Sequence, residues 1–228
     1  MFSLVVFVLY FLMEAGCSKS SSSSSKSNTN PNAGPDVTDV DGNVYHSVTI
    51  GTQVWIASNL KVTHYRNGVV IPNVTDSTQW ANDTTAAYCS YNNDPQMTAT
   101  YGRLYNWYAV ANANNLAPTG WHVASDSEWT VLTTFLGTNP GGKLKETGLT
   151  HWTSPNYGAT NSSGFTALPG ADRSYISQFH NLGIYGLFWT SSQSGGYGID
   201  RILDNTSANV YSINYPKGNG FAVRCVKN

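Results

Sequence analysis

Side chains suited to binding a sugar gather between residues 137 and 183, a stretch dense in Gly, Asn, Ser, Thr and Pro. Sugars stack on exposed aromatic rings and accept hydrogen bonds from amide and guanidinium groups, as other small ligands do. Six residues of this stretch are therefore candidate ligand-binding residues: Trp152, Asn156, Tyr157, Asp172, Arg173 and Tyr175. The alternative is structural, since aromatic residues are more often core than site, and Arg173 and Arg224 are also candidates for structural ion pairs.

Motifs for metal binding and catalysis are missing from the sequence. Residues Asp39 to Asn43 superficially match a calcium loop, but its twelfth position is Ile50, where an EF-hand needs Glu. The five histidines include no pair at the spacing of a zinc-protease helix, and no Gly-x-Ser-x-Gly elbow or phosphate loop occurs. Two well-placed carboxylates would suffice for a glycosidase. We nevertheless predict that the protein is not an enzyme and binds no metal or cofactor. At Asp39 the sequence predicts a hairpin turn instead of a calcium loop.

Composition narrows the class of protein further. The 12 basic and 13 acidic residues give a net charge of −1, which provides no field for attracting nucleic acid. Charged residues make up 11% of the chain, against roughly a quarter in average soluble domains. An aromatic content of 13% excludes disorder for most of the chain. The composition indicates a polar, weakly charged, aromatic-rich globular protein that does not bind nucleic acid.

The N-terminal segment has the pattern of an export signal. Residues 2–13 are apolar apart from Ser3. This run is shorter than the roughly 20 residues of a membrane-spanning helix, and it has the length of the apolar core of a signal peptide, about 7–15 residues. Small residues then precede Cys17, as in the lipobox of bacterial lipoproteins, although Glu14 stands where an aliphatic residue is usual and no basic residue precedes the apolar run. The alternatives are a non-lipidated signal peptide and a buried helix.

The Ser-rich stretch 18–35 has almost nothing to bury and suits a flexible tether. We therefore predict a signal peptide at 1–16, a tether at 17–35 and one domain at 36–228. A lipid on Cys17 would anchor the protein to the bacterial outer membrane, on its periplasmic or cell-surface side. In such an oxidising compartment Cys89 and Cys225 are predicted to form a disulfide; the alternative is two separate buried thiols.

Apolar periodicity predicts a β-rich domain with two helices. A hairpin is expected at 44–56, a tight turn at Asn67-Gly68, and late strands at 187–191, 199–203 and 221–226. Apolar residues spaced by three and four predict one helix within 101–113. A second helix is expected between the capping box that begins at Ser125 and Gly137. The stretch 137–183 is expected to be rich in loops.

Several short blocks follow one another along the chain. The clearest are Val37-Thr-Asp-Val-Asp-Gly-Asn-Val-Tyr45, Tyr101-Gly-Arg-Leu-Tyr-Asn-Trp-Tyr-Ala-Val110, Pro118-Thr-Gly-Trp-His-Val123, Gly164-Phe-Thr-Ala-Leu-Pro-Gly170, Trp189-Thr-Ser-Ser192 and Val223-Arg-Cys-Val226. In content and order these blocks resemble the Fibrobacter succinogenes major paralogous domain. The chain departs from the family pattern after Pro169-Gly170, where Ala171-Asp172-Arg173 replaces Gly then Arg.

The resemblance implies an α+β, C-type-lectin-like fold: two helices, a small twisted antiparallel sheet and a long loop-rich region. It also implies an exported lipoprotein or secreted protein of a family with no established activity. The resulting expectation is a membrane-anchored, non-catalytic lectin-like domain for extracytoplasmic recognition or adhesion, with polysaccharide as candidate ligand. The alternative is a structural or protein-interaction component of the cell envelope with no small ligand.

Overall fold

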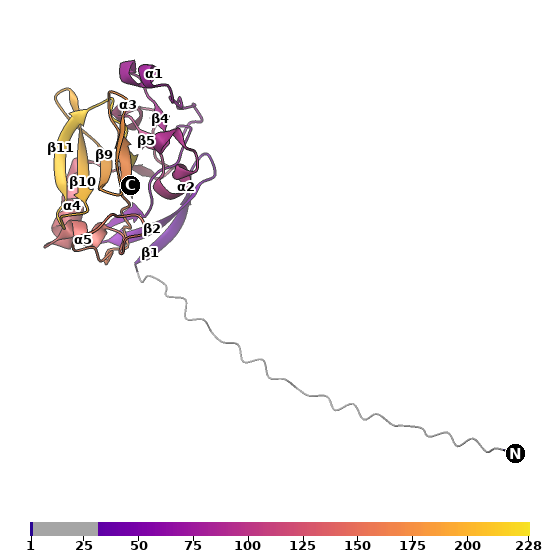
Figure 1. Cartoon of the computed structure of the whole chain (residues 1–228), viewed down its shortest axis with the longest axis vertical. Coiled ribbons are helices and arrows are strands. Elements are labelled where there is room, and N and C mark those ends of the chain that lie inside the picture. Colours follow the sequence, from indigo (N-terminus) through magenta and orange to yellow (C-terminus); the bar gives the residue numbers. More distant parts are fainter. Residues whose placement is uncertain (2–31) are drawn as a thin grey trace.

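The computed structural model describes Met1 and residues 32–228 (Figure 1). The predicted signal peptide after Met1, the lipidation site at Cys17 and most of the predicted tether lie outside the described residues. Strand β1 (Ala33–Thr38) begins within the range assigned to the tether. Among the helices that the structure describes, none is long and apolar enough to cross a membrane.

A five-stranded antiparallel sheet has the order β1-β2-β3-β13-β6. Its strands besides β1 are β2 (Val44–Ile50), β3 (Gln53–Ile56), β6 (Trp121–Val123) and β13 (Cys225–Lys227). The turn between β1 and β2 is closed by the Asp39 carboxylate, which accepts the N–H groups of Asp41 and Asn43 at 2.9 Å each. Both the predicted hairpin at 44–56 and the predicted turn at Asp39 are thereby confirmed.

A four-stranded sheet carries the long strands of the C-terminal half, in the order β11-β10-β9-β12. Figure 1 shows β11, β10 and β9 side by side. These strands are β9 (Tyr185–Ser194), β10 (Tyr197–Asp204), β11 (Tyr211–Pro216) and β12 (Ala222–Val223). Only the pairing of β12 with β9 is parallel within this sheet. Because successive side chains of a strand point to opposite faces, this sheet presents two chemically different surfaces.

The remaining elements of the described chain are short. Two-stranded sheets form from β4 (Tyr88–Cys89) with β5 (Leu104–Tyr105) and from β7 (Gly170–Arg173) with β8 (Phe179–Leu182). The helices are α1 (Ser77–Asn82), α2 (Met97–Tyr101), α3 (Trp107–Val110), α4 (Asp126–Leu136), α5 (Pro140–Leu144) and a 3-10 turn at Tyr91–Asn93.

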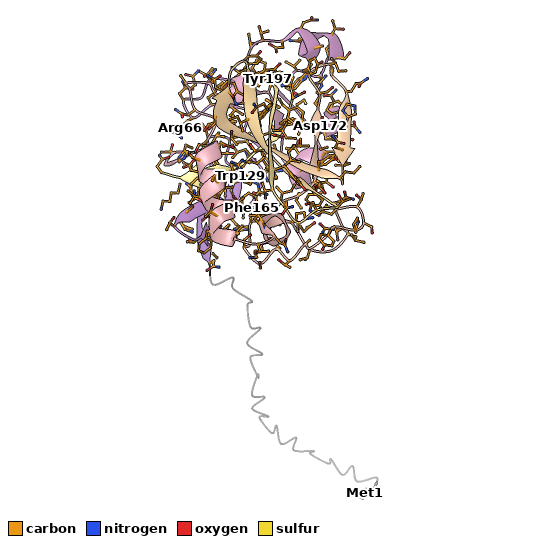
Figure 2. All side chains as sticks on the ribbon, turned by 90° about the vertical axis from the view of Figure 1, so that its left-hand side faces the viewer. Met1, Arg66, Trp129, Phe165, Asp172 and Tyr197 are labelled. Atoms are coloured by element: carbon orange, nitrogen blue, oxygen red, sulfur yellow. The ribbon has the colours of Figure 1, made fainter. Side chains whose placement is uncertain are left out.

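An aromatic cluster joins the two large sheets to α4. Trp55 of β3, Trp129 of α4, Phe188 of β9 and the loop residue Phe165 are fully buried. Figure 2 labels Trp129 and Phe165. The ring centroids of Trp55 and Trp129 lie 5.2 Å apart, and those of Trp129 and Phe188 lie 5.5 Å apart. Burying each such side chain contributes roughly 1.5–3 kcal/mol to stability. This cluster fixes the position of β9, and with it one face of the four-stranded sheet.

The predicted fold class is wrong. The described residues form thirteen strands in four sheets and five short α-helices, which is a mostly β architecture and not a two-helix, C-type-lectin-like α+β fold. The capping-box helix is present as α4, and the three late strands are present as β9, β10 and the pair β12 and β13. Strand β11 had not been predicted, and the predicted loop region contains α5, β7 and β8.

The helix predicted within 101–113 is replaced by β5 and a single turn, α3. Tyr105 exchanges backbone hydrogen bonds with Phe221, N to O at 2.9 Å and O to N at 3.0 Å. Leu104 pairs with Cys89 in the β4–β5 ladder. The Asn106 side chain then accepts the N–H of Ala109 and caps α3. Distant backbone partners therefore override a helical spacing of apolar residues, because buried backbone groups must all be paired.

Candidate functional site

Tyrosines line a cavity on the face of the four-stranded sheet that lies opposite the aromatic cluster. Cross-strand pairing aligns Tyr185 with Asp204, and Leu187 with Ile202, which in turn pairs with Tyr211. Paired residues of neighbouring strands point to the same face. Two further residues of β11, Ile213 and Tyr215, follow at period two. These side chains and Asn181 enclose a cavity of about 310 Å³.

A second cavity of about 320 Å³ adjoins the first, because Asn181, Leu187 and Tyr215 line both. Its other walls come from the β7–β8 hairpin, from the last residue of β11 and from the segment after β11: Asp172, Ser174, Tyr175, Pro216, Asn219 and Phe221. We call the two cavities together the tyrosine groove. Each cavity lies at the small end of the size range of small-ligand pockets, about 300–1,000 Å³, and together they suit an extended ligand.

The walls of the tyrosine groove are exposed, whereas its floor is buried. Tyr175 is 51% exposed, Tyr211 43% and Tyr185 36%. Leu187 and Phe221 beneath them are buried, and the ring of Tyr215 stands edge-on to Phe221 at a centroid distance of 5.2 Å. Exposed rings on a packed floor offer flat apolar surface at a low entropic cost, because the tyrosines have few rotatable bonds.

Polar groups converge on the groove from the β7–β8 hairpin and from β10. One Asp172 oxygen accepts the Asn181 amide at 2.7 Å, and the other lies 3.7 Å from Nδ1 of His180. Burial raises the pKa of Asp172, against the lowering effects of Asn181 and His180. Asp204 accepts the N–H and hydroxyl of Thr206 at 2.7 Å with one oxygen only. Asp204 therefore keeps an oxygen with no hydrogen bond to a described residue, whereas the second oxygen of Asp172 faces His180.

The hairpin that borders the groove has a strained backbone. Ala171, Ser177 and Asn181 adopt left-handed φ angles of 67°, 71° and 67°. Such conformations cost a non-glycine residue about 1–2 kcal/mol and persist where the surroundings enforce them, often at functional sites. Ala171 occupies the position where the family pattern has Gly, and it directly precedes Asp172. The strain thus lies at the residue that brings a carboxylate into the groove.

The structure divides the six predicted ligand-binding residues. Asp172 and Tyr175 line the tyrosine groove. Trp152 is buried and donates its indole N–H to the Ala167 carbonyl at 3.0 Å. Asn156 is buried and donates its amide to the carbonyls of Glu146 and Gly148.

Arg173 is a structural residue as well. Its guanidinium is buried and donates to the carbonyls of Val74 at 2.6 Å and Thr75 at 3.1 Å. Tyr157 is 60% exposed, but it lines neither cavity of the groove. The six residues therefore do not form one site.

Sequence analysis missed the residues that line most of the groove. The signal was present in β11, where Tyr211, Ile213 and Tyr215 alternate with polar residues, the period of a half-buried strand. Tyr185 and Asp204 have no comparable local signal. Their place in the groove depends on the register between β9 and β10.

The two cysteines are not bridged in the structure, which corrects the predicted disulfide. Cys89 and Cys225 are free and buried. Cys89 packs in a small cluster with Trp80 and Leu104, whereas Cys225 belongs to the cluster of Tyr105 and Trp189. Burial raises the pKa of the Cys89 thiol to about 11, despite the nearby Arg173. Each thiol therefore behaves as a small apolar core residue.

Other sites carry less chemistry. Among the described residues, no three His, Cys, Asp or Glu side chains lie close enough to hold a metal ion. A larger, mainly apolar cavity of about 850 Å³ lies between α4 and the β2–β3 hairpin. Val131 and Phe135 on its rim are 47% and 63% exposed.

The family model of the Fibrobacter succinogenes major domain matches residues 48–227. The chain belongs to this family. The match extends from β2 to β13 and so includes every strand and loop of the tyrosine groove. No curated protein and no solved structure matches the chain significantly. Family membership confirms the resemblance of the sequence blocks, and it assigns no activity.

Proposed function

We propose that this member of the family is a non-catalytic binding domain that recognises carbohydrate in the tyrosine groove. The observation that carries the proposal is the row of exposed tyrosines, Tyr175, Tyr185 and Tyr211, above a buried apolar floor. Sugar rings stack on such faces, and Asp204 keeps an oxygen that makes no hydrogen bond to a described residue and can accept one from a sugar hydroxyl. The groove continues over two cavities, which favours an oligosaccharide over a single sugar.

The test is a glycan array with the purified protein, followed by titration calorimetry on the best ligand. Tyr185→Ala and Tyr211→Ala should each weaken binding at least tenfold, because each removes a stacking surface. Tyr197→Ala is the matched control: this tyrosine is 50% exposed near one end of the same sheet and lines neither cavity (Figure 2). Equal losses in all three variants, or no glycan binding at all, would contradict the proposal.

We place this domain outside the cytoplasm, attached to the outer membrane by a lipid on Cys17. The support is the sequence pattern, an apolar run followed by small residues and a Ser-rich stretch. An attached domain with an open binding groove suits recognition or adhesion, because the lipid retains at the envelope whatever the groove binds.

One observation favours a second function, as a protein-interaction component of the envelope. The apolar cavity beside α4 has Phe135 exposed on its rim, which is unfavourable in water and suits a protein contact. If this function holds, Phe135→Ser should abolish a cross-link to one envelope protein and leave glycan binding unchanged. Tyr211→Ala should have the reverse effect under the carbohydrate proposal.

A further inference from the structure

The tyrosine groove is lined by acidic and neutral side chains. Asp204 lines one cavity and Asp172 the other, and neither lining includes a lysine or arginine. Lys145 contacts Asp204 from behind: its buried ammonium donates to three backbone carbonyls, including that of Asp204 at 2.7 Å. It is therefore occupied within the protein. The Lys145 charge also interacts with that of Asp204, and His180, beside Asp172, can add further positive charge at the groove.

A third acid lies on the same face of the sheet. Asp200 pairs across the sheet with Ile213, which lines the groove. Its side chain is fully buried, and one oxygen accepts the Ile213 N–H at 3.3 Å. The other oxygen has no hydrogen-bond partner among the described residues. Asp200 lines neither cavity, so it borders the groove without reaching a ligand bound there.

Two carboxylates face the interior of the groove. Asp204 lines one cavity and Asp172 the other, and no lysine or arginine lines either. Burial, followed by Asp200 and Asp172, also raises the pKa of Tyr215, which lines both cavities. A cation bound in the groove would favour the ionised form of Asp172 and Asp204, and an anion would oppose it. The lining is therefore complementary to positive charge.

As an extension that rests on the proposed function, we propose that the tyrosine groove prefers amino sugars to neutral sugars and rejects uronic acids and sulfated sugars. A protonated amine can lie against a tyrosine face and hydrogen-bond to the free oxygen of Asp204 or to the Asp172 carboxylate beside His180, a charge-assisted contact. A carboxylate or sulfate at the same place would lose its hydration and meet like charge.

The experiment uses oligosaccharides of equal length built from glucosamine, N-acetylglucosamine, glucose and glucuronic acid, titrated into the purified protein at a pH where the amine is protonated. We expect the glucosamine oligomer to bind at least tenfold more tightly than the N-acetylated one, and the glucuronic acid oligomer to show no binding. Asp172→Asn should remove most of the preference and retain binding of the neutral oligomers. Added salt should also reduce the preference, because it screens charge.

Asp83→Asn is the control, because this acid follows α1 and lines neither cavity of the groove. It should leave the preference intact. If Asp172→Asn lowers the unfolding midpoint, Asp204→Asn tests the same charge from the other cavity. Neutral oligomers that bind through Tyr211 with no amine preference would overturn this inference alone. Absence of binding by every oligomer would overturn the proposed function as well.

Discussion

At the scale of single residues, Arg173 fixes the hairpin that borders the groove. Its guanidinium is buried between the rings of Trp80 and Phe179, at 4.4 and 5.0 Å from their centroids. It donates to the carbonyl oxygens of Val74 and Thr75 and to the hydroxyl of Ser177. A lysine has one compact ammonium and cannot reproduce this planar set of contacts.

We therefore expect Arg173→Lys to lower the free energy of unfolding by about 3 kcal/mol, because carbonyls and rings placed around a guanidinium lose their partner. Urea denaturation of the two proteins measures this difference. Arg103→Lys is the comparison, since Arg103 donates to one carbonyl, that of Lys61, and contacts one ring, that of Tyr88. It should lose no more than about 1 kcal/mol. Equal losses would contradict the structural role assigned to Arg173.

The sequence identified Asp172 and Tyr175 as site residues because polar and aromatic side chains in a loop-rich stretch are often functional. It could not separate them from Arg173, whose partners Val74 and Thr75 lie almost a hundred residues away. Arg224 shows the same limit. It was a candidate for an ion pair, and it donates instead to the carbonyls of Ile56 and Phe165 and to the Asn59 side chain.

At the scale of elements, α4 begins with a complete capping box. Ser125 accepts the Glu128 N–H, and the Glu128 carboxylate accepts the Ser125 N–H at 2.7 Å. His122 contacts the same carboxylate at 2.6 Å. Burial tends to raise the pKa of Glu128, but the bonds from Ser125 and His122 outweigh it and hold the pKa below its ordinary value of 4.5. The helix N-terminus also favours the negative charge.

Glu128→Gln retains a capping-box residue but removes the charge that faces the helix N-terminus and His122, and should therefore lower stability by about 1 kcal/mol at neutral pH. A carboxylate with a lowered pKa stabilises the folded state above its unfolded pKa, and this contribution is lost as the pH falls through the folded value. The difference between the two proteins should accordingly be constant well above pH 4.5, decrease from there downward, and disappear once the pH is below the lowered folded-state pKa. Urea titrations across this range measure it; a difference independent of pH would contradict the assignment.

The contrast between α4 and α3 shows which elements a sequence can predict. The signals of α4 are local: a cap at Ser125, an apolar stripe and Gly137, which adopts a φ of 65° at the end. The spacing of apolar residues around Trp107 also predicts a helix, although a less clear one. There, however, the preceding residues pair with Phe221 and with β4, contacts that no local pattern contains.

At the scale of the whole molecule, the groove depends on how the sheets assemble. Tyr185, Asp204 and Tyr211 meet because β10 pairs with both β9 and β11 in one register. A shift of one residue would turn β11 over and move its tyrosines to the other face. Sequence analysis predicted β9 and β10 and missed β11. It therefore identified two strands of the groove and not the third, whose tyrosines line the outer side. The aromatic cluster with Trp129 sets this register from the opposite face.

The segment before Asn32 contains Cys17, the predicted site of lipidation. We expect the chain to incorporate labelled fatty acid when it is expressed in a bacterium. Cys17→Ser should abolish the label, because Cys17 is the cysteine that lies within a few residues of the apolar run. Cys89→Ala is the matched control: Cys89 is a buried core thiol, and its loss should leave labelling unchanged. Label retained by Cys17→Ser would refute the anchor, and the groove would then belong to a domain that is secreted or held at the envelope by protein contacts.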